Sequence, residues 1–324
     1  MRRRDFIARV GTTAVAWPLA ARAQQSERIR RIGVLIPNVA SDLETKRRLT
    51  AFRRELERLG WDENRNVYID YRFAGGVSDR YLPLARELIA LEPDVIVAGT
   101  TPVTAILHRE TRTIPIVFNS VSDPIGGGFV ASLARPGGNL TGTLQYESGI
   151  TGKWLALLKE IDPRLSRVAL VGNPKTTPFD YFVHAAQTAA LDLAIELVPA
   201  PIESADTAIK NAIGSFAAEP NGGLLVLPDT TTVVALAAQN RLPAVYPFRL
   251  FVDAGGLMAY GIDVAEAYRL SATFVDRILR GAKPADLPMQ APTGYETVVN
   301  LKTAKAIGLD VPPSLLVRAD EVIE

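Results

Sequence analysis

The chain has 324 residues, and its 36 basic and 35 acidic side chains leave a net charge of +1. A net charge this small gives no support to nucleic-acid binding. The basic clusters at 46–48 and 53–54 share a predicted helix with acidic residues, which indicates a solvent-exposed helix face. The sequence contains no cysteine. A disulfide framework and a lipid anchor on a mature N-terminal cysteine are therefore excluded.

The N-terminus has the composition of an export signal. It reads MRRRDFI, continues with an uncharged stretch at 10–21, and offers the cleavage site Ala-Arg-Ala at 21–23. Residues 3–7, RRDFI, resemble the twin-arginine motif, and a general secretory signal is the open alternative. The stretch is too short to span a membrane. We expect residues 1–23 to be removed and the mature protein to be periplasmic and not membrane-embedded.

Removal of residues 1–23 takes away five arginines and one aspartate and changes the net charge from +1 to −3. The export route can be tested at the arginine pair. Changing Arg3 and Arg4 together to lysine should block export if the twin-arginine route is used. The measurement is the yield in the periplasmic fraction, with Arg2→Lys as the control. An unchanged yield of the double variant would leave general secretion as the route.

The remaining chain alternates predicted strands with predicted helices. Strands are expected at 32–36, 67–71, 95–98, 116–118, 168–171, 194–198, 224–227, 244–246, 257–260 and 297–300. Helices are expected at 41–59, 79–91 with Asp79 as N-cap, from 102 onward, and at 179–191, 205–216, 232–239 and 264–281. Apolar strands alternating with helices indicate parallel sheets covered on both faces, which bind ligands beyond the carboxyl ends of their strands.

One piece of this pattern occurs twice. The run IVAGTTPVTAIL at 96–107 matches LVLPDTTTVVAL at 225–236, and IPIVF at 114–118 matches LPAVY at 242–246. The openings of the two copies, RIGVLIPN at 31–38 and RVALVGNP at 167–174, match more loosely. A repeat period of this length indicates a duplicated domain. We therefore expect an α/β fold of two similar lobes around a cleft.

Composition predicts where the chain passes between the lobes. The run ARPGGNLTGT at 134–143 has no helical or strand period and is expected to be the first crossover, and a proline-rich run lies at 284–292. Hinge motion is expected near 142–146, 260–264 and 288–294. The predicted lobes are 30–143 plus 264–288, and 144–263 plus 289–324.

Polar residues that follow strands at helix N-termini are the candidate ligand contacts, because free N–H groups and the helix dipole favour an anion there. In the first lobe they are Asn38, Thr100, Thr101, Ser120, Ser122 and Asp123, and in the second Asn173, Thr176, Asp229, Thr230 and Thr231. Tyr246 is the candidate for an aromatic wall. The competing interpretations are helix caps for Thr100, Thr101 and Asp229, a plain turn for Asp123, and core packing for Tyr246.

Motifs for catalysis or cofactors are absent from the sequence. It lacks HExxH, CxxC, G-x-S-x-G and G-x-G-x-x-G patterns, and VGNPKTT at 171–177 departs from the P-loop. The two histidines, His108 and His184, lie far apart in sequence. We therefore expect no enzyme activity, no cofactor and no metal.

Four segments resemble one family of ABC-transporter substrate-binding proteins, which includes the tryptophan-binding TrpX-type proteins. The segments are 114–142, AGGLMAYG at 254–261, RILRGAKPADLP at 277–288 and GYETVVNLKTAKAIGLDVPPSLLVRADEVIE at 294–324. The resemblance covers essentially the whole chain. It implies a periplasmic-binding-protein-like fold with three crossovers, and an ABC permease with its ATPase as partners. We expect a monomer.

The expected ligand is a small carboxylate, such as an amino acid or an aromatic acid. Donors at helix N-termini would hold the carboxylate, and Asp123 or Asp229 would accept from an ammonium group. A ligand that bridges both lobes would stabilise a closed form that docks on the permease. A periplasmic sensor that presents solute to a membrane receptor, and an enzyme on the same fold, are the alternatives.

Overall fold

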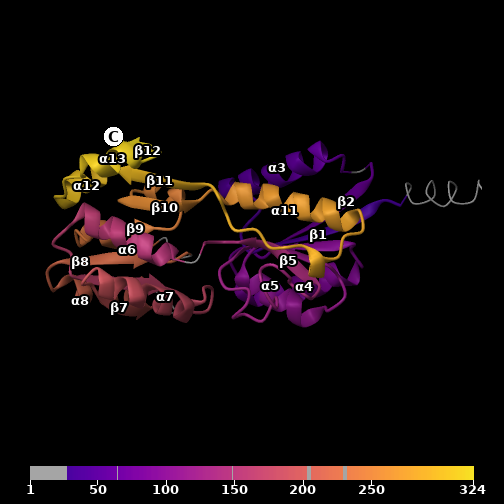
Figure 1. Cartoon of the computed structure of the whole chain (residues 1–324), viewed down its shortest axis with the longest axis horizontal. Helices are drawn as coiled ribbons and strands as arrows, with labels where there is room; N and C mark the ends of the chain where they lie inside the picture. The colour runs from indigo at the N-terminus through magenta and orange to yellow at the C-terminus, as the bar shows by residue number, and fades with distance from the viewer. Residues whose placement is uncertain (1–27, 64, 148, 203–205, 229–231) are drawn as a thin grey trace, which may run out of the picture.

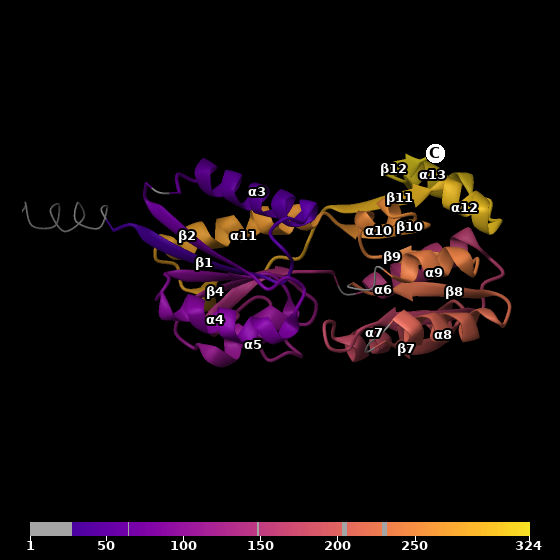
Figure 2. The ribbon, with the colours of Figure 1, turned by 180° about the vertical axis from the view of Figure 1, so that it is seen from behind.

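The computed structural model describes residues 28–63, 65–147, 149–202, 206–228 and 232–324. The predicted signal peptide lies outside the described residues. The described strands form two separate sheets with helices on both faces of each, so the chain folds into two α/β lobes along its long axis (Figures 1 and 2). No helix in these ranges combines the length with the apolar composition that crossing a bilayer requires.

The first lobe is built on a sheet of five parallel strands in the order β2-β1-β3-β4-β5. Its central strands are short apolar runs that are buried on both faces, as a parallel sheet covered by helices requires. The strands are Arg30–Ile36 (β1), Val67–Phe73 (β2), Val95–Ala98 (β3), Ile116–Val121 (β4) and Leu140–Leu144 (β5).

Helices from distant parts of the sequence cover this sheet. On α3 the buried residues Leu49, Phe52 and Leu56 recur at helical spacing, and they pack with Phe274 of α11 in one core. The other face carries a second core under α4 and α5. The helices span Leu43–Arg58 (α3), Tyr81–Ala90 (α4), Thr101–Glu110 (α5) and Val264–Leu279 (α11), and short 3-10 turns occupy Ser78–Arg80 (η2) and Pro284–Asp286 (η3).

The second lobe contains a sheet of seven strands in the order β12-β11-β10-β9-β8-β6-β7. Every neighbouring pair is parallel except β10 and β11, which are antiparallel. The strands span Arg167–Gly172 (β6), Glu196–Pro201 (β7), Gly222–Val226 (β8), Ala244–Tyr246 (β9), Met258–Ile262 (β10), Tyr295–Asn300 (β11) and Glu321–Ile323 (β12).

Two apolar cores fill the space between this sheet and its helices. One core joins α6, α7, α12 and α13 to the sheet, and the other lies under α8, α9 and α10. The helices span Ile150–Ile161 (α6), Phe179–Asp192 (α7), Asp206–Ala217 (α8), Val233–Gln239 (α9), Arg249–Asp253 (α10), Leu301–Ile307 (α12) and Pro313–Arg318 (α13).

The duplication predicted from the sequence is visible in the strand order. The first sheet reads β2-β1-β3-β4-β5, and the second reads β7-β6-β8-β9-β10 before its two extra strands. The matched segments 96–107 and 225–236 correspond to β3 with α5 and to β8 with α9. The prediction of two similar lobes is therefore confirmed.

The chain passes between the lobes three times. It leaves the first sheet after β5 and enters α6, returns from β10 into α11, and leaves again after η3 for β11. The first two passages start at the carboxyl ends of β5 and β10. In the repeated part of each sheet, the neighbouring strands run parallel to β5 or to β10. The carboxyl ends of both sheets therefore face the passage between the lobes.

Two details of the predicted elements are wrong. The run at 134–143, expected to be a loop, ends in the buried strand β5, so the first crossover begins only after Leu144. The strand was not recognised in the sequence because its glycine and threonines contribute little to a hydrophobic pattern. Asp79 lies inside η2 instead of capping the following helix, whose N-cap is Arg80.

Candidate functional site

The carboxyl end of β4 is distorted in a way that concerns the predicted ligand residues. The pairing of β4 with β5 shifts register between Phe118 and Val121, which marks a β-bulge. Inside the bulge, Ser120 has a φ of 55°, a left-handed conformation that non-glycine residues seldom adopt. Such strain persists only where the surrounding structure enforces it, and it gathers at functional sites.

Gly142 of β5 makes the bulge possible. Its φ is 152°, and a Cβ added there would lie 1.9 Å from the carbonyl oxygen of Phe118. The two backbones therefore approach each other at a distance that only glycine permits. The consequence is that the position of Ser120 depends on the absence of a side chain in the neighbouring strand.

Among the buried hydroxyl groups that have no hydrogen-bond partner in the described residues, two concern the predicted ligand residues at this end of the sheet. They are Oγ of Ser120, a residue that is 6 % exposed, and Oγ1 of Thr100, at the N-cap of α5. Thr100 does not cap the helix through its side chain. Buried hydroxyls nearly always have a partner, so these two oxygens are available for a bound molecule.

A short polar chain connects the neighbouring residues. Thr101 Oγ1 accepts a hydrogen bond from the Ser122 backbone N–H at 3.4 Å, and Ser122 Oγ donates to Gln145 Oε1 at 2.7 Å. Gln145 follows β5 and opens the first crossover. The structure thus places Thr100, Thr101, Ser120 and Ser122 near the ends of β3 and β4 and adds Gln145. Ser120 lies inside β4 instead of after it, and the next described element after β4 is β5, so the expectation of a helix N-terminus at Ser120, Ser122 and Asp123 is wrong.

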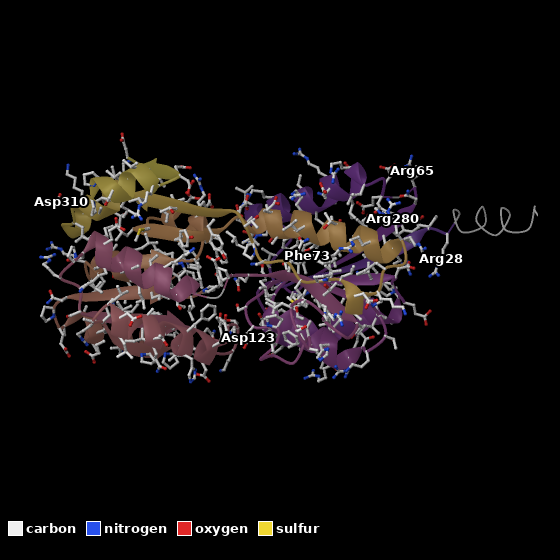
Figure 3. All side chains as sticks on the ribbon, in the orientation of Figure 1. Arg28, Arg65, Phe73, Asp123, Arg280 and Asp310 are labelled. Carbon is white, nitrogen blue, oxygen red and sulfur yellow. The ribbon has the colours of Figure 1, made fainter. Side chains whose placement is uncertain are left out.

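Asp123 lies where the first lobe approaches the second. One of its carboxylate oxygens accepts from the Gly126 backbone N–H at 2.8 Å, so it forms the turn that was the competing interpretation. Figure 3 shows its side chain on the side of the first lobe that faces α7. Burial raises the pKa of Tyr181, in the first turns of α7, and the negative charge of Asp123 raises it further. Asp123 therefore acts electrostatically on the opposite lobe.

This interaction between the lobes gives a direct test. Changing Asp123 to asparagine should lower the pKa of Tyr181 toward its ordinary value without reaching it, because burial of the phenol remains. The measurement is a pH titration of tyrosine ring resonances by NMR. Asp192→Asn, at the far end of α7, is the control. An unchanged Tyr181 titration would show that Asp123 does not face α7.

The second lobe contributes fewer described candidates. Asn173 follows β6, and its Oδ1 accepts from the Lys175 backbone N–H at 2.9 Å; Thr176 Oγ1 donates to the Asn173 carbonyl at 3.4 Å. Both residues are half-buried in the turn that precedes α7. Asp229, Thr230 and Thr231 lie outside the described residues, so their predicted role stays a prediction.

Two predicted residues lie in different surroundings. The Tyr246 side chain is 1 % exposed, and its ring stacks on Phe251 with centroids 5.3 Å apart inside a core of the second lobe. The structure therefore agrees with core packing, and we leave Tyr246 out of the proposed site. Asn38 is exposed in the loop after β1, where its carbonyl accepts from the Gly75 N–H at 3.2 Å.

Sequence reasoning missed Gln145 and Tyr181. Gln145 is the first residue after β5, so the rule that selected the other candidates would have included it if the strand had been recognised. Tyr181 lies inside α7, two residues beyond the helix start, and no strand end points to it. Across the described residues, no three His, Asp or Glu side chains gather closely enough to hold a metal ion.

Comparison with known proteins places this geometry in a family. The model for ABC transporter substrate binding proteins matches residues 40–323. A curated tyrosine-binding protein from Clostridioides difficile is 26 % identical over 88 % of this chain and 82 % of its own length. A structure of an ABC domain in complex with L-Trp, from Streptococcus pneumonia, has a TM-score of 0.83 at 23 % identity and covers 91 % of this chain and 99 % of its own.

A conserved domain protein from Vibrio cholerae gives the same TM-score of 0.83 at 26 % identity, covering 91 % of this chain and all of its own. A ligand-free, open substrate binding protein with adhesive properties, from Clostridium difficile, has a TM-score of 0.70 at 24 % identity, with coverage of 91 % and 99 %. The fold of two lobes with predominantly parallel sheets is thus shared with solute-binding proteins.

Proposed function

Since the chain belongs to the family of ABC transporter substrate binding proteins, we propose that it captures a small carboxylate between its lobes and delivers it to an ABC permease. The ligand class is an amino acid or an aromatic acid. The family is one of solute-binding proteins, and the proposed place of action is the periplasm. The permease with its ATPase is the proposed partner.

The observation that carries this proposal is the pair of buried hydroxyls of Thr100, the N-cap of α5, and Ser120, in the neighbouring strand β4. Helix α5 has 10 residues, and its first backbone N–H groups have no partner within the helix. The positive end of the helix dipole and two hydroxyl donors together suit a carboxylate. The strained backbone of Ser120 keeps one donor in place before the ligand arrives.

Asp123 provides the second half of an amino-acid site. Its carboxylate lies between the lobes, where it can accept from the ammonium group of a ligand. Tyr181 lies opposite and offers a ring and a hydroxyl from the second lobe. The relative that binds tyrosine and the structure that holds L-Trp make these two amino acids the first ligands to test.

Lobe closure is the proposed mechanism. We propose that 30–143 with 264–288 and 144–263 with 289–324 move as two bodies about the three crossovers. A ligand held by both lobes adds contacts that exist only in the closed form, so binding and closure are thermodynamically linked. The permease would then distinguish the closed form from the open one.

The first experiment is calorimetric titration of protein lacking residues 1–23 with L-tyrosine, L-tryptophan and benzoate, supported by thermal melting. A ligand at 100 times its Kd should add about 2.7 kcal/mol to stability. Binding of an amino acid or aromatic acid is the expected result. No binding by any carboxylate, together with binding of a neutral sugar, would contradict the proposal.

Thr100→Val tests the site within this function. The substitution removes a hydroxyl that has no hydrogen-bond partner among the residues that the structure describes, so stability should hold. The Kd should rise about 10- to 150-fold, corresponding to a lost hydrogen bond to a charged group of about 1.5–3 kcal/mol. Titration calorimetry and thermal melting measure the two effects.

Thr141→Val is the matched control for Thr100→Val. Thr141 is fully buried in β5, and its Oγ1 donates to the Leu287 carbonyl at 2.8 Å. This variant should lose about 1 kcal/mol of stability while its Kd stays unchanged. The reverse pattern, with lower stability for Thr100→Val and unchanged affinity, would show that Thr100 is structural.

A further inference from the structure

One cluster of side chains connects all three crossovers where they meet the second lobe. Glu147 lies in the first crossover, Tyr260 lies in β10 just before the second, and Tyr295 opens β11 just after the third. Lys153, in the first turn of α6, lies among them. We call Glu147, Lys153, Tyr260 and Tyr295 the hinge cluster.

Direct contacts hold the hinge cluster together. The Glu147 backbone N–H donates to the Tyr295 hydroxyl at 2.8 Å, which joins the first crossover to the third. The Tyr260 and Tyr295 rings stack with centroids 5.3 Å apart, which joins the second to the third. Each crossover is therefore in contact with another through a tyrosine.

Lys153 reaches every other member of the cluster. Its ammonium group lies 2.6 Å from Glu147 Oε1 and 3.2 Å from the Tyr260 hydroxyl, and it lies 5.6 and 5.7 Å from the centroids of the Tyr260 and Tyr295 rings. The hydrogen bond to Glu147, and then that to Tyr260, raise the pKa of Lys153, so it stays cationic.

We propose that Lys153 and Tyr295 are positioning residues for lobe closure, which hold the three crossovers as one unit so that they bend together. The inference rests on the closure mechanism given under the proposed function. The side chains of Lys153 and Glu147 are 53 % and 39 % exposed, so their ion pair adds little stability. The effect of Lys153 is on geometry, because its contacts with Glu147, Tyr260 and Tyr295 together restrict three backbone segments.

The cysteine-free sequence permits a clean measurement of lobe separation. Cysteines introduced at two exposed positions, Ala105 of α5 and Gln187 of α7, would carry spin labels on opposite lobes. The distance distribution between the labels is measured on ligand-free protein. Tyr295→Phe and Lys153→Met are the variants, with Tyr68→Phe and Lys302→Met as matched controls at exposed positions.

Both hinge-cluster variants should widen the distance distribution, whereas the controls keep the parental width. Once a ligand is known, its Kd should rise about threefold, because a smaller fraction of the protein is in the binding-competent form. Folded variants with the parental width would overturn the inference. If Lys153→Met fails to fold, Tyr295→Phe decides alone, since it removes a single oxygen atom.

The ligand-free distances separate this inference from the proposed function. Wider distributions without binding of any carboxylate would contradict the proposed ligand class and leave the role of the hinge cluster standing. Normal binding of a carboxylate with unchanged distances would support the proposed ligand class and overturn the role of the hinge cluster.

Discussion

Replacing Gly142 with alanine should destabilise the protein by about 3 kcal/mol or more and abolish ligand binding. The new methyl group would meet the Phe118 carbonyl oxygen at 1.9 Å, and the residue would keep a φ of 152° that alanine seldom adopts. The contact is with backbone, so no side-chain rotation relieves it. The two strands must separate, and the bulge that holds Ser120 is lost with them.

Chemical denaturation and ligand titration measure the two losses. Gly138→Ala is the matched control, because Gly138 lies in the turn before the same strand and an added methyl would meet nothing within 4 Å. The control should keep both stability and affinity. A stable Gly142→Ala protein with parental affinity would show that the approach of β5 to the bulge does not determine the site.

Trp154→Ala should cost about 3–5 kcal/mol of stability, as removal of a buried tryptophan generally does. Its side chain is 1 % exposed, and its ring contacts those of Tyr146 and Phe182 at centroid distances of 5.2 and 6.3 Å. The indole N–H also donates to the Tyr260 carbonyl at 2.7 Å. The substitution leaves a cavity and an unpaired carbonyl in β10.

Trp154→Phe separates these two contributions. It keeps most of the ring packing and should cost about 1–3 kcal/mol, mainly through the unpaired Tyr260 carbonyl. Urea denaturation followed by circular dichroism provides the measurement. The control is Trp61→Phe in the first lobe, where the indole donates to Asp276 at 2.8 Å. Equal stability of Trp154→Phe and the parent would show that the bond to Tyr260 is energetically neutral.

The sequence predicted the architecture well because most of the strands are apolar runs that carry their own signal. The strands β3 and β9 were predicted at the residues where they occur, and the repeat predicted two similar lobes, which the common strand order confirms. In contrast, β5 consists of Leu140, two threonines, a glycine and Leu144, and its identity as a strand comes from pairing with β4. Tertiary contacts of that kind leave little trace in a local pattern.

The candidate site was predicted only in part for a related reason. Strand ends selected Thr100, Ser120 and Asp123, since parallel sheets bring the carboxyl ends of their strands to one edge. The same rule selected Tyr246, because it cannot distinguish a side chain that is buried in the core of a lobe from one that faces the space between the lobes. Neither the left-handed Ser120 nor the charge of Asp123 acting on Tyr181 has a sequence signature, since both arise from the packing of separate segments.

Through the two crossovers after β5 and β10, the two lobes exchange helices. The helix after β5 packs on the second sheet, and the helix after β10 packs on the first, so each half of the duplicated chain completes the other. During synthesis, the first sheet is finished at residue 144, but the core on its α3 side stays open until 264–279 has been made. The nascent first half therefore exposes an apolar face over a long stretch of translation. Its folding is tied to the completion of the second half, and contacts this distant in sequence form slowly.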